Sequence, residues 1–182
     1  MLSSPSSGWS IRMIFAYLPK AFHDGQDLEA RHRMLMAASL AGIAFGQSGA
    51  ALTHSFGHSI GAIFNIHHGR AVGLFIPYVF QFYQAVSDKF LVICDALELP
   101  PGNPSERMKA LTALVKTFFR ELGLALTLAE MGISEADLEA RMGTLVRYTR
   151  EDVDTLFSPR PMSPEECERI FRCAHAGTDV DF

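Results

Sequence analysis

The sequence is poor in cysteine, in long apolar runs and in clustered basic residues, and each shortage excludes a class of protein. Its three cysteines form an odd set without a CxxC pair, which indicates free thiols in a reducing compartment rather than a disulfide framework. The longest apolar run, residues 72–80, contains a glycine and a proline. A membrane-spanning helix needs about 18 uninterrupted apolar residues, so we expect no membrane span. The net charge is -4 without a Lys/Arg run, so we expect no nucleic-acid partner.

The sequence also lacks sustained alternation of apolar and polar residues, so it predicts no β-sheet. Hydrophobic residues make up 48% of the chain, as is normal for a globular protein, and they recur at helical spacing. We therefore expect an all-α fold, a multihelical bundle, with a single helical domain over residues 11–182. Residues 1–10 are rich in serine and carry no positive charge. They predict a flexible leader rather than a secretory signal, and we expect a cytoplasmic location.

Cap residues mark several of the expected helices. Asp27 predicts the start of a helix over residues 28–48, with Leu35 and Phe45 on its inward face. Ser163-Pro-Glu-Glu166 has the pattern of a capping box with proline in the first turn, and it predicts a last helix. Residues 70–83 are apolar almost all round, which is typical of a central helix.

Histidines concentrate in one apolar stretch, where four of them fall within residues 54–68. His54 and His58 are four residues apart, so a helix places both on one face. His68 follows just before a glycine. Its side chain and that of the adjacent His67 should diverge, so one of the two should face elsewhere. A lone histidine in an apolar helix is more often a hydrogen-bonded core residue. Four close together favour a divalent metal site, because neutral imidazole ligates Fe, Zn, Cu and Ni.

The chain lacks residues that three other functions would require. A zinc peptidase of the HExxH type has glutamate after its first histidine, where this chain has Ser55. An unrelated helical metallohydrolase would need a carboxylate near the histidines, and residues 53–70 contain none. The glycines at 42, 46 and 49 follow no predicted strand, so they do not form a dinucleotide-binding turn.

Around the histidines the chain resembles the iron-containing (group III) alcohol dehydrogenase family. That family has a signature of two histidines four apart, a glycine, a later His-Gly pair and an apolar helix with a Leu/Ile-Pro pair. The residues of this chain that match are His54, His58, Gly61, His68, Gly69, Ile76 and Pro77. Ser158-Pro-Arg-Pro161 resembles the closing turn of the family, so the likeness extends over nearly all of residues 11–182.

The resemblance implies roles for individual residues. Family members have an N-terminal NAD(P)-binding α/β domain and a C-terminal helical domain, and this chain resembles only the second. An Asp and a His one helical turn apart, together with the first and last signature histidines, hold the metal in the family. His54 and His68 are thereby implied as metal ligands, His58 as a catalytic proton-relay or positioning group, and Phe45 as part of the substrate pocket. Asp154 falls in a loop where some family members have other residues near the cofactor.

The resemblance implies that this chain is part of a metal-dependent alcohol dehydrogenase. Such an enzyme would use Fe²⁺ or Zn²⁺ as its metal, NAD or NADP as its cofactor, and a small alcohol or aldehyde as its substrate. The Asp/His pair should precede Ile11, where nothing matches it, and the nucleotide domain is absent. We therefore expect a truncated enzyme that binds metal weakly and is inactive alone. It should self-associate or pair with a companion nucleotide-binding chain. The alternative is a non-enzymatic helical metal-binding or interaction module.

Overall fold

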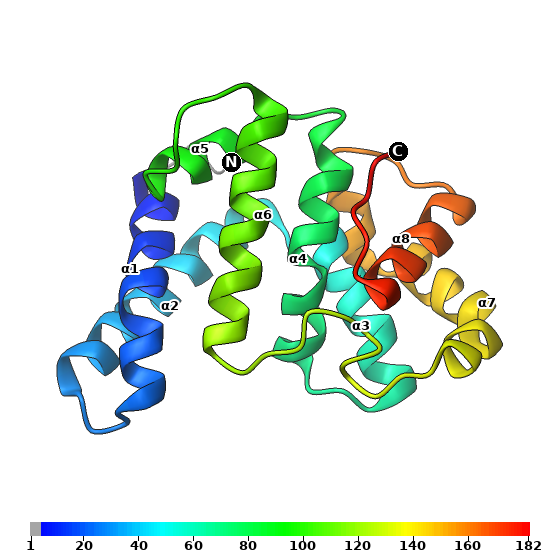
Figure 1. Ribbon diagram of the computed structural model, residues 1–182, viewed down its shortest axis with the longest axis horizontal. Coiled ribbons are helices and arrows are strands. Elements are labelled where there is room, and N and C mark those ends of the chain that lie inside the picture. Colours follow the sequence, from blue (N-terminus) through cyan, green and yellow to red (C-terminus); the bar gives the residue numbers. More distant parts are fainter. Residues whose placement is uncertain (1–4) are drawn as a thin grey trace. The chain divides into compact units, whose positions relative to one another are not determined.

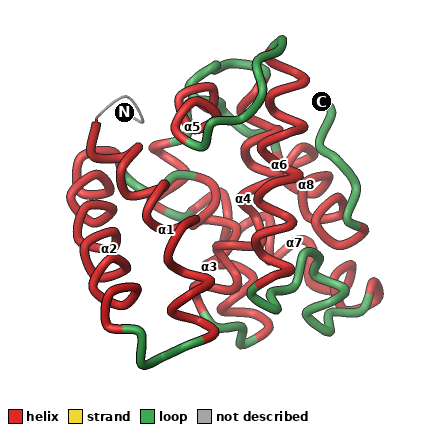
Figure 2. Tube along the Cα trace, turned by 60° about the vertical axis from the view of Figure 1, so that its left-hand side comes forward, coloured by secondary structure: helices red, strands yellow, loops and turns green. Residues whose placement is uncertain are grey.

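The computed structural model of the chain describes residues 5–182, which fold into helices without a strand among them (Figure 1; Figure 2). The helices in chain order are α1 (Pro5–His23), α2 (Leu28–Ser48), α3 (Leu52–Phe64), α4 (His68–Gln84), α5 (Phe90–Ala96), α6 (Pro104–Glu121), α7 (Glu135–Glu151), the 3₁₀ helix η1 (Val153–Phe157) and α8 (Pro164–Ala176). The all-α prediction is confirmed. Within the described range, no helix combines the length and apolar character that crossing a membrane requires.

Internal contacts divide the chain into two compact units, where the sequence led us to expect one domain. The first unit comprises residues 5–49 and Asp88–Leu122, and it contains α1, α2, α5 and α6. The second comprises Ala50–Ser87 and Gly123–Phe182, and it contains α3, α4, α7, η1 and α8. The four clustered histidines all belong to the second unit, whereas Phe45 belongs to the first.

In the first unit, α1 and α2 pack against each other. Helix α1 begins at Pro5, so residues 5–10, which we expected in a flexible leader, are helical. Ser10 is buried and its hydroxyl donates a 2.9 Å hydrogen bond to the carbonyl of Ala37 on α2. Residues 1–4 of the expected leader lie outside the described range. Asp27 caps α2 as predicted, since its carboxylate accepts the N–H of Ala30 at 2.9 Å.

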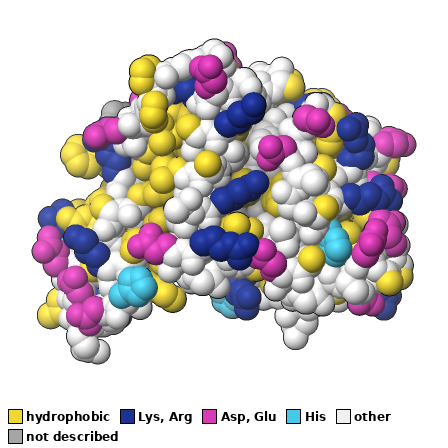
Figure 3. Space-filling model, in the orientation of Figure 1, with side chains coloured by type: hydrophobic (Ala, Val, Ile, Leu, Met, Phe, Trp, Pro, Cys, Tyr) yellow, Lys and Arg dark blue, Asp and Glu magenta, His cyan; other side chains and the backbone are white. Residues whose placement is uncertain are grey.

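The predicted inward face of α2 is wrong. Leu35 and Phe45 are 68% and 50% exposed, whereas Ala30 and Ala37 are fully buried. Small alanine side chains allow α1 to approach α2 closely, so the helix buries its alanine face and leaves its bulky apolar face open. Apolar side chains also reach the surface around α1 and α5, while charges of both signs are interspersed over the face that Figure 3 shows.

The second unit contains a large aromatic core. Phe56 of α3 stacks on Phe75 of α4 with ring centroids 4.9 Å apart, and the ring of Phe171 on α8 meets Phe56 edge-on at 4.8 Å. Helix α4 is the central element that its composition predicted, with seven buried side chains. The capping box predicted for the last helix is confirmed at Ser163 and Glu166.

Helices α3 and α4 approach most closely at Gly57. A Cβ atom at this position would lie 2.5 Å from Cγ2 of Val72 and 2.8 Å from its Cα and N atoms. Because part of this obstacle is backbone, only glycine permits the observed distance between the two helices. The same approach sets His54 and His58 of α3 beside the first turn of α4.

We predict that Gly57→Ala destabilises the protein by about 1–3 kcal/mol, because the added methyl group forces α3 away from α4. The matched control is Gly143→Ala on α7, where an added Cβ meets nothing within 4 Å. That change should stabilise the protein by about 0.5–1 kcal/mol, as alanine does in an open helical position. Urea unfolding measures both. Equal effects of the two substitutions would contradict the close approach at Gly57.

Candidate metal centre

Three imidazole rings gather at one end of the α3–α4 pair. His54 and His58 lie one turn apart on α3, with ring centroids 5.7 Å from each other. The ring of His68, the first residue of α4, lies 5.4 Å from that of His54 and 5.3 Å from that of His58. The structure therefore brings together the three histidines that the sequence selected, although ten residues separate His58 from His68.

The turn between α3 and α4 reverses the chain so that His68 comes back to α3. Asn65 follows the last residue of α3 in the left-handed conformation with φ 54°. The N–H of Ile66 then bonds back to the carbonyl of Gly61 at 3.2 Å. His67 is the N-cap of α4, and its exposed side chain lies over Gly69. The ring contacts of the cluster join His54, His58 and His68, so His67 is the one of the two adjacent histidines that faces elsewhere.

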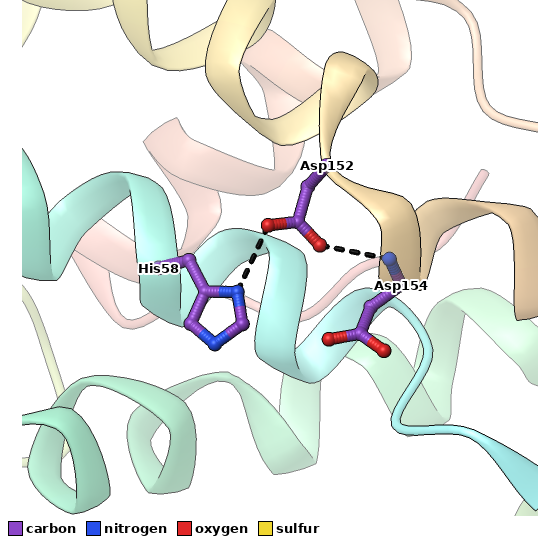
Figure 4. Close-up of side chains that lie close together, drawn as sticks. All are labelled: His58, Asp152 and Asp154. Carbon is purple, nitrogen blue, oxygen red and sulfur yellow. Dashed lines mark hydrogen bonds and ion pairs between the residues drawn. The ribbon is translucent and has the colours of Figure 1, made fainter.

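A carboxylate from far along the chain contacts the cluster. Asp152 lies between α7 and η1, and its Oδ2 accepts a 2.9 Å hydrogen bond from Nδ1 of His58 (Figure 4). Its Oδ1 accepts the N–H of Asp154 at 2.9 Å and the hydroxyl of Ser55 at 3.3 Å. A buried 2.8 Å hydrogen bond between Ser59 and Thr149 holds the end of α7 beside α3. The position of Asp152 is thus determined by the contact between these helices.

The surroundings of the site favour a neutral His54 ring and an ionised Asp152 carboxylate. Burial by itself would raise the pKa of Asp152, but hydrogen bonds from His58 and the Asp154 N–H outweigh it and lower that pKa. An ionised carboxylate only accepts hydrogen bonds, so the shared proton lies on Nδ1 of His58. Burial lowers the pKa of His54 against the opposing effect of the Asp154 charge. A neutral ring retains a lone pair that a metal can use.

The sequence reasoning missed Asp152, and it named Asp154 without placing it beside the histidines. It found no carboxylate within residues 53–70, yet ligand atoms of His58, Asp152 and Asp154 all lie within 4.8 Å of one another. No local pattern identifies an acidic residue some 90 positions away as a neighbour. The sequence signal at this place is limited to two closely spaced aspartates, Asp152 and Asp154. Imidazoles and carboxylates together fit a divalent transition metal, so the donor set is suitable for one.

The chain matches the C-terminal model of the Fe-containing alcohol dehydrogenase family over residues 7–175. It is 32% identical to the NADPH-dependent butanol dehydrogenase of Clostridium saccharobutylicum over 181 residues, which are 99% of this chain and 46% of the relative. It is also 32% identical to the NAD-dependent methanol dehydrogenase of Bacillus methanolicus, with 91% and 43% covered. The chain therefore spans about half the length of these curated relatives.

A solved structure shows the same helical architecture. The iron-containing alcohol dehydrogenase of Thermococcus thioreducens superposes with a TM-score of 0.82 at 26% identity, covering 97% of this chain and 46% of that one. The fold and the sequence matches thus agree. They leave no support for an unrelated metallohydrolase, even though the carboxylates which that function would need are present.

We predict that Asp152→Ala costs about 1–2 kcal/mol of stability, because it removes the cap of η1 and the partner of His58. Asp152→Asn should cost about half as much, since the amide oxygen still caps η1. Urea unfolding at neutral pH measures both.

The lowered pKa of Asp152 also sets the sign of a pH effect. The stability that its ionised form contributes is present above the unfolded-state pKa and is lost as the pH falls through the folded-state pKa. The difference between wild type and Asp152→Asn should therefore shrink in acid. If Asp152→Ala and Asp152→Asn lower the stability equally at neutral pH, the result contradicts the role of Asp152 as the cap of η1.

Proposed function

This chain belongs to the Fe-containing alcohol dehydrogenase family, and we propose that it forms the metal-binding part of an enzyme that interconverts alcohols and aldehydes with NAD(P). The observation that carries the proposal is the approach of His54 and His68. These two rings come from different helices, and their centroids lie 5.4 Å apart. Both belong to the histidine signature in which the chain resembles the family.

We propose His54 and His68 as metal ligands, with Fe²⁺ or Zn²⁺ as the metal. Neutral imidazole suits both metals, so the residues do not select between them. The bound metal would supply Lewis-acid stabilisation of negative charge that develops on an alcohol oxygen. Burial at His54 keeps that ring neutral and ready to bind.

His58 is the proposed catalytic residue of the complete enzyme. Asp152 holds its Nδ1 and directs its Nε2 away from the carboxylate (Figure 4). A hollow of about 250 Å³, lined by His58 and Tyr148 among others, opens beside the ring. In this arrangement Nε2 can accept a proton from a bound hydroxyl group, and the Asp152 carboxylate stabilises the charged ring that results.

The names of the relatives support a small alcohol or aldehyde as substrate, and NAD or NADP as the hydride carrier. Hydride transfer is the chemistry of the nicotinamide itself. We propose Phe45 as part of the substrate pocket on the resemblance, and the exposure of its side chain is compatible with contact to a ligand. A cytoplasmic location remains our expectation.

The nucleotide would be bound outside the residues described above. A dinucleotide-binding turn follows a strand, and residues 5–182 contain no strand. We propose a companion nucleotide-binding chain or self-association. The bulky apolar side chains exposed on α2, Leu28, Leu35, Ile43 and Phe45, support a contact of this kind.

We predict that the chain binds one Zn²⁺ and that His54→Ala and His68→Ala each weaken binding about tenfold or more, because each removes a ligand. Isothermal titration measures the affinities, and far-UV circular dichroism confirms the fold of each variant. The matched control is His67→Ala, next to His68 in sequence, which should bind Zn²⁺ like the wild type. If neither His54→Ala nor His68→Ala lowers the affinity, the proposed site is wrong.

We expect this chain by itself, loaded with Fe²⁺ or Zn²⁺, to give no turnover of butanol or methanol with NAD or NADP. The physical reason is that the nicotinamide has no site to align it with the alcohol carbon. The assay follows the absorbance of the reduced nicotinamide. Robust turnover by the polypeptide alone would contradict this prediction.

A further inference from the structure

Helix α3 carries two buried serines one turn apart, among its histidines. Ser55 and Ser59 are 0% and 1% exposed. Both contact the segment that runs from the end of α7 into η1. The hydroxyl of Ser59 lies 2.8 Å from that of Thr149, and the hydroxyl of Ser55 lies 3.3 Å from Oδ1 of Asp152. Of these two contacts, the one at Ser55 involves an ionised group, so Ser55 can act on the chemistry of the site.

The Ser55 hydroxyl binds the Asp152 oxygen that His58 leaves free. Oδ2 accepts Nδ1–H of His58 at 2.9 Å (Figure 4), whereas Oδ1 accepts the Ser55 hydroxyl at 3.3 Å and the N–H of Asp154 at 2.9 Å. Donors on both oxygens oppose rotation of the carboxylate. Burial by itself would raise the pKa of Asp152, and Ser55 is one of the donors that lower it, after His58 and the Asp154 N–H.

Thr155 of η1 holds the Ser55 hydroxyl from the other side. Its Oγ1 lies 2.8 Å from Oγ of Ser55 and 2.6 Å from the carbonyl oxygen of Thr149. A hydroxyl group has one hydrogen to donate, so Ser55 and Thr155 have more acceptors than hydrogens. A hydrogen bond to an ionised group is roughly twice as strong as a neutral one. The Ser55 hydrogen therefore goes to the Asp152 carboxylate, and the Thr155 hydrogen is left for Ser55 and the Thr149 carbonyl.

We propose that Ser55 is a positioning residue for His58 and acts on it through Asp152. With Oδ1 held by Ser55, Oδ2 keeps the proton of the neutral His58 ring on Nδ1 and leaves the lone pair on Nε2. In water a neutral histidine ring favours the opposite tautomer, with its proton on Nε2. The inference rests on the proposed function, in which Nε2 of His58 accepts a proton from a bound hydroxyl group. Ser55 thus helps to make this nitrogen an acceptor.

The tautomer of His58 in the metal-free chain tests the role of Ser55. Two-bond ¹H–¹⁵N correlation spectra at a pH where the ring is neutral distinguish Nδ1–H from Nε2–H, and His58→Gln assigns the signals. We expect Nδ1–H in the wild type. Ser55→Ala should shift the ratio of the tautomers about fivefold toward Nε2–H, because one hydrogen bond contributes a factor of this order. The matched control, Ser59→Ala, removes the other buried hydroxyl and should leave the tautomer of His58 unchanged.

The inference is overturned if the wild-type ring carries its proton on Nε2, or if Ser55→Ala leaves the ratio unchanged. Equal shifts in Ser55→Ala and Ser59→Ala also overturn it, because loosening of α3 from α7 would then explain both. Circular dichroism checks the fold of each variant. If Ser55→Ala does not fold, Ser55→Cys replaces it, since a thiol is similar in size and only a weak donor.

The proposed function is tested separately, by the Zn²⁺ titrations of His54→Ala and His68→Ala. Unchanged affinities there overturn the metal site and leave the tautomer of the metal-free chain as it is. A failed tautomer experiment overturns the role of Ser55 and leaves those affinities as they are.

Discussion

The close approach of α3 and α4 at Gly57 is the constraint on which the candidate site depends. Val72 occupies the space that any side chain at position 57 would need, so the two helices can meet only around glycine. This contact and the left-handed Asn65 turn return His68 to the histidine face of α3. The aromatic core beneath, where Phe56 meets Phe75, holds the two helices in that register. The packing of apolar residues thus determines where the rings of His54, His58 and His68 lie.

The second determinant is the end of α7, which brings Asp152 to His58. The Ser59–Thr149 hydrogen bond anchors this end to α3, and the carboxylate then orients an imidazole while capping η1. The Asp152 side chain therefore both caps η1 and orients the ring of His58.

Family membership and unit structure also fit together. The candidate site is contained in one compact unit, while the first unit exposes the bulky apolar side of α2. An exposed apolar surface of this kind is typical of an interface. The family model covers residues 7–175 and therefore both units, so the exposed face belongs to the family fold.

Local sequence determined the helices and their ends, because caps such as Asp27 and Ser163 act on backbone atoms within three residues. It also identified His54, His58 and His68, since a helical turn and a His-Gly pair are local features. Only the tertiary structure decided that α2 buries its alanines rather than Leu35 and Phe45, and that Asp152 joins the histidines. Both depend on which helix packs against which face, and contacts between distant segments leave no periodic signal in the chain.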